Sequence, residues 1–160
     1  LQQMQQTVQS ILELQYRQAE AVEEQVDVRA LLGQMLDTRS TLLKEKQLTV
    51  DLRGEWTLAT DARLLEKILD SLLGNALDYT EREGQIELWL DGGLTLANEP
   101  AQIRAEVLDQ AMEPFVSSSM EAGCGLGLYI AKSYAAMLGL ELALEYRGER
   151  VQVDLHRKHT

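Results

Sequence analysis

Three glycines at alternate positions, Gly123, Gly125 and Gly127, lead directly into an apolar run with helical spacing. Glycine permits a close approach of the backbone to an anion. The helix expected to begin near Gly125 or Leu126 directs unpaired N–H groups and a partial positive charge towards whatever precedes it. The stretch can therefore bind phosphate without basic side chains. Short glycine patterns also arise by chance, so an ordinary turn before a helix is the alternative interpretation.

A second candidate group is Asn75, which lies in an apolar segment with helical spacing. Ser71 and Asn75 are four residues apart, so they share one face of the predicted helix. An amide oxygen at this place can join the ligands of a Mg²⁺ ion bound to phosphates, because magnesium prefers oxygen ligands and takes few from protein. The alternative is an asparagine near a helix end that bonds to its own backbone.

The helices that must position these groups are predicted from caps and periodicity. Asp27 and Asp61 are candidate N-caps, because each precedes an apolar-periodic segment. The first helix should run from residue 28 with a face that continues to residue 43, and the second should cover about five turns from residue 62. A third helix follows the glycines and should end at Gly139, a residue type suited to a C-cap.

Alternation of apolar and polar residues predicts three hairpins. They pair residues 48–52 with 56–58, 86–90 with 94–96, and 140–146 with 151–155. Residues 97–100 should leave the second hairpin as a polar turn, and residues 98–122 should form a long loop with a short helix around 103–112. Hairpins interleaved with helices predict an α/β (α+β) fold, a two-layer sandwich of a mixed, mostly antiparallel sheet with helices on one face.

A long helix is predicted to precede this sandwich. Its apolar residues fall at steps of three and four in a glutamine-rich stretch, which is typical of a helix packed on a partner helix. The alternative is a helix that lies on its own domain. The polar residues 20–24 predict a boundary between residues 1–25 and a domain of residues 26–160.

Charge and composition restrict the partners of the chain. Its 160 residues include 15 basic and 26 acidic side chains, which gives a formal net charge of −11. This excess argues against nucleic acid and anionic membrane surfaces as partners, because both require a concentration of lysine and arginine. The single cysteine, Cys124, excludes an intramolecular disulfide framework and a cysteine-rich metal cluster. No apolar run approaches the roughly 18 residues of a membrane-spanning helix.

Four of these features stand in a characteristic order. They are the helix "LLGNALDYT", the polar segment at residues 97–100, the loop "EPFVSSS" and the helix start "GCGLGLYIAK". In this order and at this spacing they resemble the ATP-binding catalytic domain of sensor histidine kinases, which shares the Bergerat fold of the GHKL superfamily with gyrase, the Hsp90 chaperones and MutL. The resemblance runs from about Val26 to the C-terminus. The leading helix then looks like the second helix of the dimerisation and phosphotransfer hairpin.

The resemblance implies roles for individual residues. Asn75 would act in catalysis by helping to chelate Mg²⁺, and Tyr79 would lie against the adenine of ATP. Asn98 would accept the adenine amino group through its side-chain carbonyl. The other implied positions are the lid residue Phe115, the phosphate-facing Gly123, Gly125 and Gly127, and Leu126 and Leu128 under the nucleotide. Tyr79 and Phe115 would be core aromatics in most other folds.

The sequence departs from the family pattern at several places. The family has a D-x-G-x-G box, whereas this chain has residues 98–102 without a glycine and with Asn98 in place of the aspartate. Ser71 stands where many members have a first asparagine, and Asp78 stands where a basic residue commonly faces the phosphates. The histidines of the chain, His156 and His159, lie beside basic residues near the C-terminus, where a solvated tail is expected. The family's phosphoacceptor histidine would lie on an upstream helix, so we expect this chain to be a fragment that does not autophosphorylate alone.

The function that the resemblance implies is that of a protein-histidine kinase. The chain would bind ATP and Mg²⁺, and the γ-phosphoryl group would pass to the upstream histidine and then to a response regulator. The full-length protein would be a homodimer through the helical hairpin, with this domain in the cytoplasm and an anchor in the bacterial inner membrane. One alternative is a degenerate domain that binds nucleotide weakly or not at all and acts as a regulatory or dimerisation module. Another is a serine kinase or other ATPase of the same superfamily.

Overall fold

A computed structural model describes residues 22–101 and 124–158 of the chain, without the side chains of residues 124–127. The predicted leading helix, the predicted short helix at 103–112, Phe115, Gly123 and His159 lie outside the described residues. No helix in the described part is long and apolar enough to cross a membrane.

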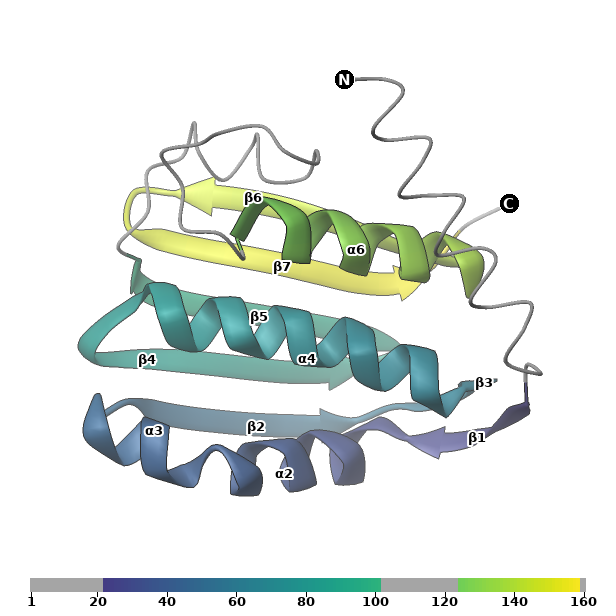
Figure 1. The fold of residues 1–160 in the computed structure, drawn as a ribbon, viewed down its shortest axis with the longest axis horizontal. Helices are drawn as coiled ribbons and strands as arrows, with labels where there is room; N and C mark the ends of the chain where they lie inside the picture. The colour runs from purple at the N-terminus through teal and green to yellow at the C-terminus, as the bar shows by residue number, and fades with distance from the viewer. Residues whose placement is uncertain (1–21, 102–123, 159–160) are drawn as a thin grey trace.

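A five-stranded mixed sheet forms one layer of the fold (Figure 1). Its strand order is β2 (Thr49–Glu55), β4 (Thr80–Asp91), β5 (Gly93–Ala101), β7 (Arg150–Arg157) and β6 (Leu140–Arg147). β2 runs parallel to β4, and the other neighbours are antiparallel. A separate two-stranded sheet pairs β1 (Glu23–Asp27) with β3 (Thr57–Asp61). The mixed, mostly antiparallel sheet that the sequence predicts is confirmed.

The helices form a second layer on one face of this sheet (Figure 1). They are α2 (Val28–Thr38), α3 (Ser40–Glu45), α4 (Ala62–Tyr79) and α6 (Cys124–Met137). In Figure 1, α4 lies over β4 and β5, and α6 lies over β6 and β7. Both predicted N-caps are confirmed, because Asp27 accepts a hydrogen bond from the Ala30 N–H at 3.2 Å and Asp61 accepts one from the Arg63 N–H at 3.0 Å. Gly139, with φ at +74°, follows α6 as predicted.

Two local predictions for residues 28–58 are wrong. Residues 48–52 and 56–58 do not form a hairpin, since β2 pairs with β4 in the register Thr49 with Gln85, while β3 pairs with β1. The physical reason is that alternation fixes which face of a strand is buried, and not which strand lies beside it. The first helix is also interrupted, since α2 ends at Thr38 and α3 begins at Ser40, with Arg39 between them at φ −106° and ψ 13°.

The core lies between α4 and the sheet. The predicted wide apolar face of α4 is confirmed, because its leucines and isoleucine are buried along the length of the helix. The largest fully buried side chains are Leu32, Leu65, Ile68, Leu69, Leu73, Leu77, Ile86, Leu88, Leu90, Leu96, Leu155 and Val28. Burial of this apolar face against the sheet holds α4 in place, since each buried aliphatic side chain contributes about 1.5–3 kcal/mol.

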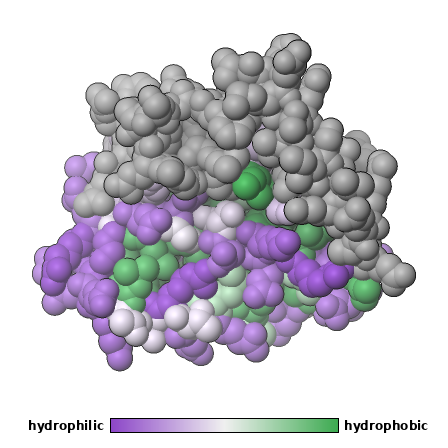
Figure 2. Space-filling view, in the orientation of Figure 1, coloured by the Kyte–Doolittle hydropathy of each residue, from purple (hydrophilic) through white to green (hydrophobic). Residues whose placement is uncertain are grey.

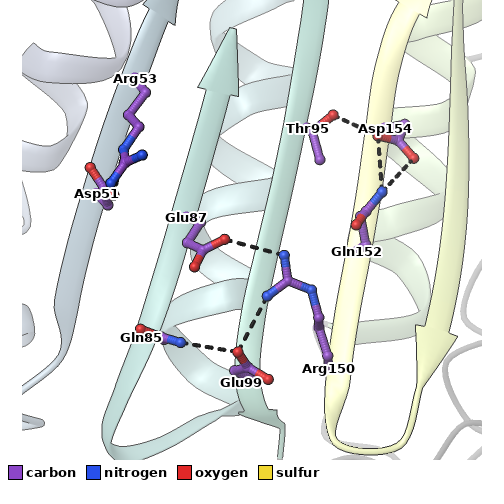
Figure 3. Close-up of polar contacts among 9 residues, drawn as sticks. All are labelled: Asp51, Arg53, Gln85, Glu87, Thr95, Glu99, Arg150, Gln152 and Asp154. Carbon is purple, nitrogen blue, oxygen red and sulfur yellow. Dashed lines mark hydrogen bonds and ion pairs between the residues drawn. The ribbon is translucent and has the colours of Figure 1, made fainter.

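The opposite face of the sheet carries many polar side chains (Figure 3), together with the exposed Trp89. Arg150 on β7 bridges two neighbouring strands, with Glu87 at 3.2 Å and Glu99 at 3.3 Å. Thr95 donates a hydrogen bond to Asp154 at 2.8 Å. On the helix side, hydrophilic residues also cover much of the described surface, with smaller apolar areas between them (Figure 2). The polar open face is typical of a sheet that has a single layer of helices.

The N-cap of α4 gives a prediction about pH dependence. Asp61 is 4% exposed. Burial alone would raise the pKa of the Asp61 carboxyl, but hydrogen bonds from the Arg63 side chain and from the backbone N–H groups of Arg63 and Leu64 outweigh it and hold the pKa below its usual value. A lowered folded-state pKa stabilises the fold at pH above the ordinary aspartate value of about 3.9. This contribution is lost as the pH falls through the folded-state pKa.

We therefore expect Asp61→Asn to lower the free energy of unfolding by about 1–2 kcal/mol at pH 7, because bonds to a charged acceptor become bonds to a neutral one. The difference from the parent should shrink as the pH falls below about 4. Urea unfolding at several pH values measures both quantities. Asp37→Asn, at an exposed position in α2, is the matched control and should stay within about 0.5 kcal/mol of the parent. A difference for Asp61→Asn that persists unchanged at pH 2 would contradict this account.

Candidate functional site

Asn75 lies in the last turns of α4, on the side of the helix that faces the sheet and α6. Its side-chain nitrogen Nδ2 is buried and has no hydrogen-bond partner among the residues that the structure describes. A buried amide without a partner costs about 1–3 kcal/mol, so such groups are rare in folded proteins and need an explanation. The sequence also allowed that the Asn75 side chain bonds to the backbone of its own helix. That alternative does not account for an Nδ2 atom that has no partner among the described residues. The side chain retains unused capacity for a ligand.

Asn75 opens onto a small cavity between the two layers. The lining comes from α4, α6 and three strands, and consists of Leu72, Asn75, Ala76, Tyr79, Leu96, Asn98, Leu128, Leu144, Val151 and Val153. The cavity volume is about 30 Å³, which exceeds the roughly 10–15 Å³ that a water molecule needs. A flat ligand could therefore place only one edge in it. An apolar wall with a few polar groups is typical of small-molecule sites.

Asn98 lies in this cavity wall, within a strand. The predicted polar turn at residues 97–100 is wrong, because β5 continues to Ala101. Asn98 pairs with Ile86 of β4 on one side and with Val151 of β7 on the other. The Ala101 N–H donates to the Glu149 carbonyl at 2.8 Å, which extends the strand beyond Asn98. The backbone of Asn98 is therefore held from both sides, and its side chain is 5% exposed.

Tyr79 is the last residue of α4, and its half-buried side chain contributes to the same wall. The end of the helix is fixed from two directions. The Thr80 hydroxyl donates to the Ala76 carbonyl at 2.5 Å, and Lys46 Nζ donates to the Leu77 carbonyl at 2.6 Å. A cation at the carbonyl end of a helix is favourable because of the helix dipole. Sequence reasoning missed Lys46, since nothing in its neighbourhood shows that it reaches a helix end about thirty residues later.

The glycine segment lies at the start of α6. The helix begins at Cys124, so Gly125, Leu126 and Gly127 all fall in its first turn, where backbone N–H groups have no partner within the helix. Leu128 is 3% exposed and contributes to the cavity wall. Further along α6, the Lys67 ammonium of α4 lies 5.7 Å from the ring centroid of buried Tyr134, and this cation–π contact links the two helices. Burial raises the pKa of the Tyr134 hydroxyl above its usual value.

The structure thus brings together Asn75, Tyr79, Asn98 and Leu128 from the predicted site, with the first turn of α6 at the start of the helix that carries Leu128. The described residues that line the cavity include no carboxylate and no basic side chain. Within the described ranges, no group of three or more histidine, cysteine or acidic residues is arranged to hold a metal ion. Ser71 is half-buried and Asp78 is exposed on α4. The prediction for His156 is wrong, because this residue lies in β7, opposite Glu141 of β6, and not in a solvated tail.

Comparison with known proteins agrees with this arrangement. Residues 60–159 match the sequence pattern of the family described as histidine kinase-, DNA gyrase B- and HSP90-like ATPases. The chain is 37% identical over 89 residues to the sensor protein RstB of Escherichia coli, covering 51% of this chain and 21% of that protein. It is 30% identical over 171 residues to the sensor protein CreC of Escherichia coli, covering 96% of this chain and 36% of that protein. The chain therefore spans between about a fifth and little more than a third of the length of these two relatives.

A solved structure shares the fold. The crystal structure of full-length ShkA in complex with AMPPNP superimposes with a TM-score of 0.69 at 21% identity, over 94% of this chain and 36% of that chain.

Proposed function

The chain belongs to the family of histidine kinase-, DNA gyrase B- and HSP90-like ATPases, as a histidine kinase ATP-binding domain, and from this premise we propose that its parent protein transfers the γ-phosphoryl group of ATP to a histidine. The observation that carries the proposal is that Nδ2 of Asn75 is buried with no partner in the described part of the chain, beside an apolar cavity whose wall also contains Asn98 and Tyr79. A nucleotide would supply the partner that the amide lacks.

In this proposal the base of ATP lies towards the cavity. Tyr79 and Leu128 offer apolar surface to its faces, and Asn98 offers a hydrogen-bonding group to its edge. The phosphates lie towards the first turn of α6, where glycine at positions 125 and 127 adds no side chain between them and the backbone. The packing of Leu126 under the nucleotide stays a prediction. Phe115 and Gly123 stay predictions for the lid that precedes this helix. Catalysis is then mainly a matter of positioning and charge stabilisation.

Asn75 also suits a magnesium ion that is shared with the phosphates. Its amide can turn its oxygen towards the ion, because no described group holds the Nδ2 atom in place. Mg²⁺ takes one or two oxygens from protein and the rest from phosphate and water, so a site without a carboxylate cluster is compatible with it. When bound, the ion would neutralise charge on the phosphates. Asn75 would orient the ion and the phosphates, and the N–H groups of α6 would stabilise the phosphate oxygens.

The proposal extends to the parent protein. The acceptor histidine would lie on the first helix of a dimerisation hairpin, and the phosphoryl group would pass on to a response regulator. The domain would work in the cytoplasm of a membrane-anchored homodimer. The relatives RstB and CreC are named as sensor proteins, which supports this arrangement.

A degenerate, regulatory domain is the second candidate. It is favoured by the small volume of the cavity, about 30 Å³, and by the absence of glycine in residues 98–102. In that case the fold would serve as a scaffold, and nucleotide would bind weakly or not at all.

Calorimetric titration of the chain with a non-hydrolysable ATP analogue and Mg²⁺ separates the two candidates. The proposal expects saturable binding that Gly125→Ala weakens at least about tenfold, because a methyl group blocks approach of the phosphates to the backbone. Gly33→Ala in α2, where an added Cβ meets nothing within 4 Å, is the matched control and should bind like the parent. If the unsubstituted chain does not bind the ATP analogue, the kinase proposal is rejected and the degenerate domain is favoured. For the parent protein, an acid-labile phosphohistidine on the upstream helix is the expected product.

A further inference from the structure

We propose that Asn98 makes the nucleotide site tolerant of the group at C6 of the purine, so that 6-oxopurine and 6-aminopurine nucleotides bind with similar affinity. The inference rests on the proposed function, because it assumes that a nucleotide base enters this site. It concerns the choice of substrate, which the family assignment does not address for this chain.

The first step is the neutrality of the pocket. Seven of the ten described residues that line the cavity are leucine, alanine or valine, and the polar ones among them are Asn75, Asn98 and Tyr79. A charged ligand group would lose its hydration there without gaining a counter-charge, which is strongly unfavourable. The edge of a neutral heteroaromatic ring fits this chemistry, since it needs only a few hydrogen-bond partners in an apolar wall.

The second step is the fixed position of Asn98. Its strand is hydrogen-bonded on both sides, to Ile86 and to Val151, and its side chain is 5% exposed. The backbone therefore cannot shift to suit one base or another. What can change is the rotation of the side-chain amide by about 180° about its last bond, which exchanges its oxygen and nitrogen.

The third step is the chemistry of the amide. A carboxylate at this position would accept hydrogen bonds only, so it would select a base that carries an exocyclic amino donor. The amide of Asn98 has both an acceptor and donors. Adenine presents an amino donor and a ring acceptor on this edge, whereas hypoxanthine and guanine present a carbonyl acceptor and a ring N–H donor. Each of the two amide orientations is complementary to one of these patterns.

Titration of the chain with nucleoside diphosphates and Mg²⁺ tests the inference. ADP, IDP and the purine ribonucleoside diphosphate with hydrogen at C6 differ only at the edge in question. We expect ADP and IDP to bind within about fivefold of each other. The unsubstituted purine should bind at least about tenfold more weakly, because it has only the ring acceptor on this edge and leaves the amide oxygen of Asn98 without a donor.

Two variants test whether Asn98 is the residue that contacts the C6 edge of the base. Asn98→Leu keeps the shape of the side chain and removes its hydrogen bonds, so all three ligands should bind equally weakly. Asn98→Asp should prefer ADP over IDP by at least about tenfold, since the carboxylate repels the 6-carbonyl oxygen. Circular dichroism and a thermal midpoint check that each variant is folded. The comparison of the three ligands on the unsubstituted chain does not depend on the variants.

The possible outcomes are distinguishable. If the parent binds ADP but binds IDP a hundredfold more weakly, the inference is overturned and the proposed function stands. If ADP and IDP bind alike and folded Asn98→Leu keeps its preference for them over the unsubstituted purine, Asn98 does not read the base and the inference is also overturned. If the unsubstituted chain binds no nucleotide, both the proposed function and the inference are rejected.

Discussion

Replacing Asn75 with leucine should abolish binding of Mg²⁺ and ATP while leaving the domain at least as stable as the parent. Leucine has the same branched shape as asparagine but no polar atoms. Because Nδ2 of Asn75 is buried and no described residue is its partner, its removal relieves a desolvation cost of about 1–3 kcal/mol. We expect the free energy of unfolding to rise by about 1 kcal/mol, after the cost of fitting a larger side chain. Affinity for an ATP analogue with Mg²⁺ should fall at least about a hundredfold, which is about 2.7 kcal/mol.

If Asn75→Leu raises the free energy of unfolding and lowers the affinity for nucleotide, Asn75 is a residue that serves the ligand at a cost to the stability of the fold. Urea unfolding gives the first quantity and calorimetric titration the second. Ser71→Ala is the matched control, because Ser71 lies one turn earlier on the same helix and is also half-buried. It should change both quantities only slightly. A loss of stability above about 1 kcal/mol in Asn75→Leu, together with unchanged binding, would show that Asn75 serves the structure alone.

The parts of the fold that sequence predicted correctly are those set by local chemistry. Asp27 and Asp61 cap their helices because a carboxylate placed there meets backbone N–H groups within three residues. The second and third hairpins form because their turns contain glycines with positive φ, at Gly92 (64°) and Gly148 (60°). The apolar face of α4 follows from its period alone.

The parts that sequence did not predict depend on contacts between distant segments. β2 crosses over to lie parallel to β4, and the chain between them forms β3 and α4. No pattern in either strand indicates that partner. Asn98 was expected in a turn, yet β7 extends the strand around it. For the same reason, sequence could propose Asn75, Tyr79, Asn98 and Leu128 as site residues only as a set implied by resemblance, and could not show that Nδ2 of Asn75 would be buried without a partner.

Gly54→Ala should produce the largest loss of stability among the substitutions considered for the described residues. Gly54 has φ at +85°, a region that costs a residue with a Cβ about 1–2 kcal/mol. An added Cβ would also contact the backbone oxygen of Leu90 in the neighbouring β4, and a backbone atom between paired strands cannot move aside as a side chain can. In addition, the Gly54 carbonyl accepts a hydrogen bond from Arg29 of α2 at 2.9 Å. We expect the free energy of unfolding to fall by about 3–4 kcal/mol in total.

Gly33→Ala is the matched control, because the same chemical change is made where nothing lies within 4 Å of the new methyl group. Gly33 is in the interior of α2, so alanine should raise the free energy of unfolding by about 0.8–1 kcal/mol through its higher helix propensity. Urea unfolding of both variants gives the two values with opposite signs. If Gly54→Ala lost less than about 1 kcal/mol, β2 would have to be free to shift away from β4, and the parallel pairing that separates this fold from a simple series of hairpins would be wrong.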